Sequence, residues 1–176
     1  MRERGAPLPG AAPGRARTGA WFALAAAVVV ADRLSKWLLL AYVAPGELRE
    51  ITGFFNLVLV FNKGAAFSFL AGAPGWQTPL FAAVAIAAAI VVSVLLARGA
   101  GSHYFKLGLA LILGGALGNL WDRLQYGQVV DFLDFHAFGW HWPAFNVADA
   151  GISVGAVLLI IDSFLIRHEP ARAEHG

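Results

Sequence analysis

The sequence has 176 residues, of which 59% are hydrophobic and only 14% are charged, and its mean hydropathy is +0.65. Because soluble domains carry about 25% charged residues, these values exclude an ordinary soluble domain and indicate a single membrane-embedded unit over 1–176. The net charge of +2, with no basic stripe, argues against a nucleic-acid partner. The chain has no cysteine, which excludes disulfides and thiol catalysis.

The N-terminal part begins with a basic tail. Residues 1–17 are rich in Pro, Gly, Ala and Arg and are predicted to be disordered and cytoplasmic. Residues 18–43 are apolar except around Asp32 and Lys36, and we expect the first membrane span there. A secretory signal peptide cleaved after Ala31 is the alternative, although apolar residues resume soon afterwards. Asp32 and Lys36 share a helix face, which predicts a supporting ion pair or a face that borders a polar cavity.

Residues 44–77 differ in composition, because β-branched and aromatic residues replace alanine. The segment is too short for a soluble domain, so we expect a small sheet that rests on the membrane surface. Strands are predicted at 54–61 and 66–70. The Asn62-Lys63-Gly64 sequence between them is typical of a hairpin turn.

Three further apolar segments, at about 79–97, 105–121 and 147–166, complete four predicted spans. The third contains Gly114-x-x-x-Gly118 and the fourth Gly151-x-x-x-Gly155, a spacing that lets helices pack closely in lipid. Four spans place both termini on one side of the membrane. Most of the Lys and Arg residues lie at the termini and in the 98–106 region, so these parts are predicted to be cytoplasmic and the sheet to lie at the outer face.

Four aspartates, Asp122, Asp131, Asp134 and Asp149, follow one another between the third and fourth spans. Carboxylates are costly in apolar surroundings, so each needs a partner or a function. Asp122 is predicted to form a salt bridge or cap at the end of the third helix, and it is also a fallback catalytic candidate. Asp134 is expected to be exposed.

Asp131 and Asp149 are the preferred catalytic pair. Asp131 lies in the apolar run Val129–Leu133, where poor solvation raises the pKa of a carboxyl group. Asp149 follows Asn146 by three residues, a spacing that also fits a simple helix cap, and the helix dipole there favours the ionised form. Two carboxyl groups with such different surroundings can act as an acid and a base.

Other chemistries fit the sequence less well. Ser35 and Lys36 could suggest a serine–lysine hydrolase, but adjacent helical residues point about 100° apart. Asp134, His136 and His141 could bind a metal ion, but their spacing is nonspecific. The glycines are not followed by the Lys-Ser/Thr of a phosphate-binding loop.

The sequence resembles the lipoprotein signal peptidase, or signal peptidase II, family in four blocks that occur in order. They are DRLSK at 32–36, NKGAAFS at 62–68, GGALGNLWDR at 114–123 with VVDF at 129–132, and FNVAD at 145–149. The resemblance covers all but the first 17 residues and a short C-terminal tail. It implies an α-helical membrane protein with four spans and a small extracytoplasmic sheet.

The resemblance also implies a function. The family consists of membrane-embedded aspartic peptidases that remove the signal peptide of prolipoproteins, immediately before a cysteine that carries a diacylglyceryl group. It implies that Asp131 and Asp149 are catalytic, without a metal or cofactor. The expected substrate-binding residues are Asn62, Gly64, Asn119, Arg123 and Asn146, and the expected supporting residues are Asp32, Lys36 and Asp122.

The expected partners are a lipid-modified prolipoprotein and membrane lipids, and the expected enzyme is a monomer in the bacterial cytoplasmic membrane with its site at the outer face. Two functions of other classes stay open at this point. One is a small transporter or channel that uses Asp32, Lys36 and the outer aspartates as an ion path. The other is a non-catalytic assembly factor in which the aspartates are caps and anchors.

Overall fold

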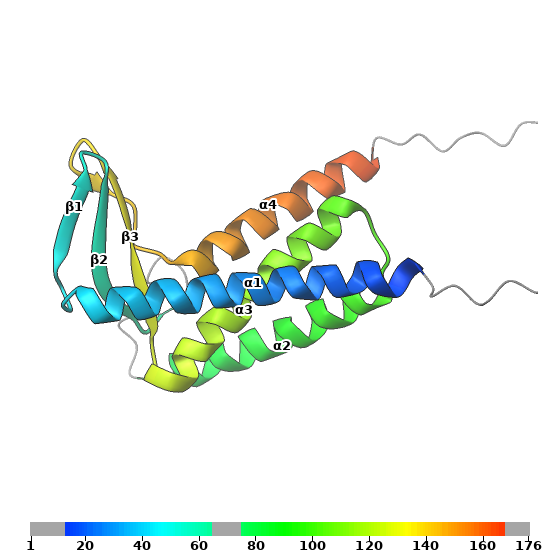
Figure 1. The fold of residues 1–176 in the computed structure, drawn as a ribbon, viewed down its shortest axis with the longest axis horizontal. Helices are drawn as coiled ribbons and strands as arrows, with labels where there is room; N and C mark the ends of the chain where they lie inside the picture. Colours follow the sequence, from blue (N-terminus) through cyan, green and yellow to red (C-terminus); the bar gives the residue numbers. More distant parts are fainter. Residues whose placement is uncertain (1–12, 65–74, 168–176) are drawn as a thin grey trace, which may run out of the picture.

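The computed structural model describes residues 13–64 and 75–167. These residues form four helices and four strands, which are α1 (Pro13–Tyr42), β1 (Leu48–Thr52), β2 (Phe55–Asn62), α2 (Gln77–Arg98), α3 (His103–Tyr126), β3 (Val129–Ala137), β4 (Trp140–His141) and α4 (Val147–Arg167). Figure 1 shows the helices in one bundle and the sheet at the end of the bundle where α1 and α3 finish. The start of α1 and the end of α4 lie at the opposite end.

The helices confirm the predicted apolar segments but extend beyond them. α1 begins at Pro13, so residues 13–17 of the predicted disordered tail are helical; proline is tolerated in a first turn, and alanine and arginine favour helix. α1 also continues unbroken through Ala31, which disfavours the signal-peptide alternative. Among the described residues, α2, α3 and α4 are long and apolar enough to cross a membrane.

α3 runs to Tyr126, five residues past the predicted end of the span. Gly127 then ends the helix with a φ of 70°, a left-handed conformation that glycine adopts without steric cost. The extension places Asp122 and Arg123 on the last turns of α3. Both side chains are therefore held by regular helix, not by a loop.

Glycines let α3 approach its neighbours closely, as the two predicted small-residue motifs require. A methyl group at Gly114 would lie 2.6 Å from Cβ of Val28 on α1. A methyl group at Gly155 of α4 would lie 2.6 Å from the backbone oxygen of Gly108 on α3. These helices are in backbone contact, and any larger side chain would force them apart.

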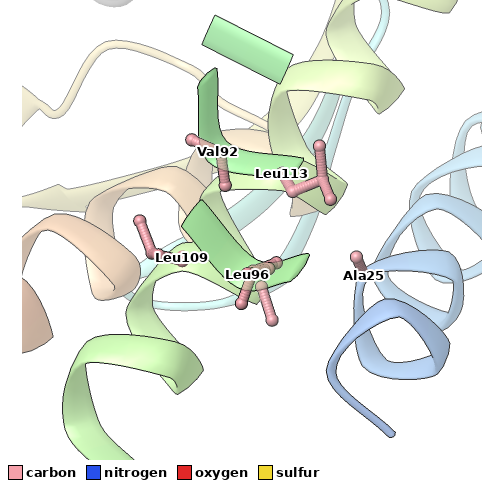
Figure 2. Packing of buried hydrophobic residues seen from close by; sticks show 6 residues of the cluster. Ala25, Val92, Leu96, Leu109 and Leu113 are labelled. Atoms are coloured by element: carbon pink, nitrogen blue, oxygen red, sulfur yellow. The ribbon is translucent and has the colours of Figure 1, made fainter. Parts of the chain in front are cut away.

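The apolar core of the bundle lies toward the end away from the sheet. Ala25 of α1, Val92 and Leu96 of α2, and Leu109 and Leu113 of α3 pack against one another (Figure 2). Because every one of these side chains is apolar, this cluster contributes packing alone.

The sheet is antiparallel, with the strand order β1-β2-β3-β4. β2 confirms the strand predicted at 54–61, and the apolar run around Asp131 forms part of β3. The predicted strand at 66–70 lies outside the described residues. β1 was not predicted as a strand, and it pairs with β2 instead. Val43, Leu59 and Val130 pack together and seat the sheet on the end of α1.

Candidate active site

Asp131 lies near the start of β3, opposite Val60 of β2, where the register between the two strands shifts. Its side chain is almost fully buried, with 2% of the residue exposed. One carboxylate oxygen accepts a hydrogen bond from Asn62 Nδ2 at 3.0 Å, and the other accepts one from Asn146 Nδ2 at 2.7 Å. Two amides from different elements therefore hold this carboxyl group.

The surroundings of Asp131 raise its pKa. Burial, and after it the neighbouring carboxylate of Asp149, raise the pKa of Asp131 to about 7. The hydrogen bonds from Asn62 and Asn146 act in the opposite direction, because they stabilise the ionised form. At neutral pH this group is thus balanced between a proton donor and a proton acceptor, as general acid–base chemistry requires.

Asp149 occupies the first turn of α4. Its backbone N–H donates to Asn146 Oδ1 at 2.9 Å, which is the cap that the spacing predicted. Its side-chain Oδ1 accepts a hydrogen bond from Asn119 Nδ2 at 2.7 Å. The cap and the site are therefore compatible, because the carboxylate that begins the helix is also bonded by α3.

Two asparagines connect the aspartates. Asn146 Nδ2, besides its bond to Asp131, lies 3.2 Å from Asn119 Oδ1, and Asn119 in turn donates to Asp149. Lys36 Nζ also donates to Asn119 Oδ1, at 3.2 Å. The oxygen of Asn119 thus faces Lys36 and Asn146, so its amide nitrogen faces Asp149.

A cavity of about 480 Å³ lies against this group, between α2, α3 and α4. Its polar side chains include Asn62, Asn119, Arg123 and Asp149, while most of the remaining lining is apolar, for example Phe81 and Val84 of α2 and Ile112 of α3. Asp149 lines the cavity directly. Asp131 is not in the lining and reaches its edge through Asn62. The cavity suits a ligand that is largely apolar with a polar end.

Arg123 and Gly64, both predicted to bind substrate, contact each other. Arg123 Nη2 donates to the backbone oxygen of Gly64 at 2.8 Å, and its guanidinium lies 5.5 Å from the ring centre of Phe81. The backbone N–H of Gly64 donates to Asn62 Oδ1 at 2.8 Å. Arg123 thereby fixes the chain that follows β2 beside the cavity.

The predicted supporting residues form a buried ion network with Arg33. Lys36 Nζ lies 2.7 Å from Asp32 Oδ2 and 2.7 Å from Asp122 Oδ2, and all three side chains are fully buried. Asp122 also pairs with Arg33, and its Oδ2 accepts the backbone N–H of Val130 at 3.2 Å. The two aspartates and the two basic residues balance in charge. The network includes the predicted Asp32–Lys36 ion pair.

This network also contacts α4 and β3, the elements that carry Asp149 and Asp131. Asp32 Oδ1 accepts the backbone N–H of Ala148 at 3.0 Å, next to Asp149 on α4. Asp122 holds the start of β3 through Val130. The contacts support a structural role for Asp122, because both of its oxygens are already paired. Arg33 was not predicted to take part, although its position beside Asp32 was a usable signal.

Asp134 differs from its prediction, because it is buried with 5% of the residue exposed. Its Oδ2 accepts from Asn56 Nδ2 at 2.7 Å, and Nδ1 of His141 lies 2.9 Å from the same oxygen. Burial alone would raise the pKa of Asp134, but the hydrogen bonds from Asn56 and His141 lower it. The group therefore ties β2, β3 and β4 together. Asn56 was missed because its partner lies 78 positions away.

This chain is similar to known proteins in sequence and in fold. Residues 24–165 match the family model described as signal peptidase (SPase) II. Lipoprotein signal peptidase of Ralstonia nicotianae is 60% identical over 144 residues, which cover 82% of this chain and 83% of that protein. The Paraburkholderia phytofirmans protein of the same name is 56% identical over 142 residues, covering 81% and 83%.

Two solved structures have a similar fold. A bacterial membrane enzyme determined by the in meso method at 2.3 Å superposes with a TM-score of 0.78 at 28% identity, over 90% of this chain and 95% of that one. A second, at 1.9 Å, gives 0.73 at 28% identity, over 86% and 95%. The family assignment sets aside the transporter and assembly-factor alternatives. The chain belongs to the signal peptidase II family, and it is a membrane-bound aspartic peptidase that cleaves prolipoprotein signal peptides.

Proposed function

We propose that Asp131 and Asp149 are the catalytic pair of this peptidase and that they share one proton. The observation that carries the proposal is the connection of the two carboxyl groups through Asn146 and Asn119, at the polar end of an apolar cavity. Among the described residues Asp149 is the one carboxyl group in the cavity lining, and Asp122 is engaged in the ion network instead. The two aspartates titrate as a unit.

The proposed reaction uses one ionised and one protonated aspartate. The ionised carboxylate takes a proton from water as the water oxygen attacks the carbonyl carbon before the lipidated cysteine. The protonated carboxyl donates its proton to the developing oxyanion. Collapse of the tetrahedral intermediate breaks the C–N bond. The departing amine takes a proton from one carboxyl group, a hydroxyl of the intermediate returns its proton to the other carboxylate, and the pair again holds a single proton.

The substrate-binding residues orient the peptide. Asn62, Asn119 and Arg123 line the polar end of the cavity and supply amide and guanidinium donors to backbone oxygens. Gly64 and Asn146 act from beside it, through Arg123 and Asp131. Such positioning can supply several kcal/mol of the barrier. The apolar walls suit the lipid-modified end of the substrate, and the sheet forms a cradle over the peptide.

The membrane arrangement follows from the helices. α2 has 22 residues, which span about 33 Å at 1.5 Å per residue, close to the thickness of a bilayer core. α1, which is 30 residues long and packs beside α3, is proposed as the fourth span. Its three charged residues at the sheet end are neutralised within the ion network.

Exposed aromatic residues support placing the membrane surface at the sheet end. Trp37 and Tyr42 lie near the end of α1, and Trp121 and Tyr126 near the end of α3. Trp and Tyr gather at membrane–water interfaces. Arg98 and Lys106 lie at the other end, so that end is proposed to be cytoplasmic. The enzyme would act as a monomer in the cytoplasmic membrane of a bacterium, with its site at the outer face.

The test is a cleavage assay in vesicles with a precursor whose cysteine carries diacylglyceryl. Asp131→Asn and Asp149→Asn should each lower turnover by about three orders of magnitude, as expected for the loss of an acid or a base. Asp134→Asn is the matched control, because it removes a buried carboxylate of the same strand that lies outside the pair. Near-normal turnover in either of the first two variants would remove that residue from the pair.

A further inference from the structure

The β3–β4 hairpin and the residue after it carry exposed aromatic side chains, and the cleavage reaction provides no role for those at the hairpin tip. Phe138 at its tip is fully exposed, and Trp140 is 60% exposed. Phe135 and Trp142 are also exposed. We call these four residues the aromatic surface. A contiguous exposed apolar patch usually marks an interaction site.

The backbone of the turn makes the position of Phe138 unusual. Phe138 has a φ of +53°, and Gly139 follows with +78°. Two residues with positive φ are typical of the tight turn that matches a twisted hairpin, and Asn-Gly is the preferred pair. A bulky side chain is disfavoured in this conformation. An aromatic ring kept at this position despite that cost suggests a function for the ring itself.

The aromatic surface is continuous with the substrate cavity. A second cavity, of about 370 Å³, lies under the hairpin and is lined by Phe135, His136, Ala137, Trp140, Trp142 and Phe145. Trp142 and Phe145 also line the large cavity beside Asp149. Trp142 and Phe145 thus form a wall that the two cavities share. In Figure 1 the far end of the sheet projects past the start of α4, to the side of the bundle.

The chemistry of the hairpin identifies its partner. Residues 135–145 contain no Asp, Glu, Lys or Arg, so an acidic or basic partner has no charge to meet. Tryptophan and phenylalanine without charge suit the interfacial layer of a bilayer. The exposed aromatic residues at the ends of α1 and α3 are at the same end of the bundle.

We propose that the aromatic surface inserts into the outer-leaflet interface beside α4 and anchors the free end of the sheet to the lipid. The anchor would hold the sheet at the depth where a lipid-modified substrate approaches the cavity. The inference rests on the proposed placement of the active site at the outer membrane surface. It concerns the lipid bilayer as the partner, not the substrate peptide.

The absence of cysteine from the sequence makes a depth measurement direct. Ala137→Cys places a spin label beside Phe138, and Ala100→Cys places one in the exposed loop between α2 and α3 as a matched control. Both proteins are reconstituted into phosphatidylcholine nanodiscs. Collisions with oxygen, which concentrates in lipid, are compared with collisions with a water-soluble nickel complex.

The label at 137 should favour oxygen, and the label at 100 should favour the nickel complex. Adding Phe138→Asn should return the label at 137 to water, and 0.5 M salt should not, because the contact is uncharged. In unlabelled enzyme, Phe138→Asn should raise KM for the lipidated precursor about threefold with kcat unchanged, as the loss of a partly buried ring predicts.

Equal exposure of the two labels to the nickel complex would overturn the anchor. So would a label at 137 that leaves water only when precursor is added, because the aromatic surface would then belong to the substrate. Unlabelled enzyme in the same nanodiscs reports cleavage separately. Failure of the anchor with normal cleavage therefore leaves the proposed function intact, and loss of cleavage by the wild-type chain would count against the function.

Discussion

Asn146 donates its side-chain Nδ2 to Oδ1 of Asp131 at 2.7 Å, across 15 positions of sequence. Its own Oδ1 accepts the backbone N–H of Asp149 at 2.9 Å. A single amide thus orients one carboxyl group and caps the helix that carries the other. Because the side-chain nitrogen contacts Asp131 and the side-chain oxygen caps the helix, the two roles can be separated by substitution.

Asn146→Ser should keep the cap and lose the bond to Asp131. Serine is as good a helix cap as asparagine, but it is too short to reach β3. We expect an unfolding midpoint close to that of the wild type and a loss of turnover on the order of 100-fold. Asn146→Ala should be less stable than Asn146→Ser by about 1 kcal/mol in the free energy of unfolding, because it also loses the cap. Equal midpoints for the serine and alanine variants would show that the cap contributes nothing.

The raised pKa of Asp131, about 7, predicts a dependence of stability on pH. In the unfolded chain this group has a pKa near 3.9, so its contribution to stability is complete below about pH 4 and is lost as pH rises through about 7. Asp131→Asn removes this dependence. The difference in unfolding midpoint between the two proteins should widen from pH 4 to 7 and level off above, in thermal unfolding in detergent.

The same pKa predicts a change in the cleavage rate around neutral pH. Asn62→Leu removes a hydrogen bond that lowers the pKa of Asp131. The limb of the pH–rate profile that reports the ionisation of Asp131 should therefore move to higher pH. A limb that moves to lower pH, or not at all, would mean that Asp131 does not control it.

Lys36 neutralises Asp32 and Asp122 from a fully buried position. Lys36→Met keeps the apolar stem and leaves both carboxylates with incomplete partners, so we expect a loss of about 3–5 kcal/mol in the free energy of unfolding. Arg49→Met is the control, because it breaks the exposed pair with Glu47 and should leave the unfolding curve unchanged. Similar curves for the two variants would show that the buried network is not stabilising.

Gly155 lies where α4 touches α3. Gly155→Ala places a methyl group 2.6 Å from the backbone oxygen of Gly108 and 2.7 Å from Ile112, so we expect a loss of about 1–3 kcal/mol. Gly19→Ala on α1 is the control, since nothing lies within 4 Å of its added methyl. It should leave stability equal or raise it by up to about 1 kcal/mol. Denaturant titration of both variants measures the difference.

The helices and strand β2 could be predicted from the chain. A run of about 20 apolar residues has few alternatives to a membrane helix, and the Asn146–Asp149 spacing specifies a local cap whatever surrounds it. The Asp32–Lys36 pair was likewise predictable, because a helix places residues four apart on one face. The errors include the element ends, β1, where exposed residues leave no periodic signal, and Asp134, which was expected to be exposed and is buried.

The partners of the aspartates were decided only by tertiary structure. Nothing local indicates that Arg33 pairs with Asp122, that Asn56 buries Asp134, or that Arg123 holds the backbone of Gly64. Each of these contacts joins residues at least 59 positions apart. Local sequence specifies backbone conformation and which face is apolar. The packing of α3 against α1 and α4, through glycines that admit backbone contact, determines which polar groups meet.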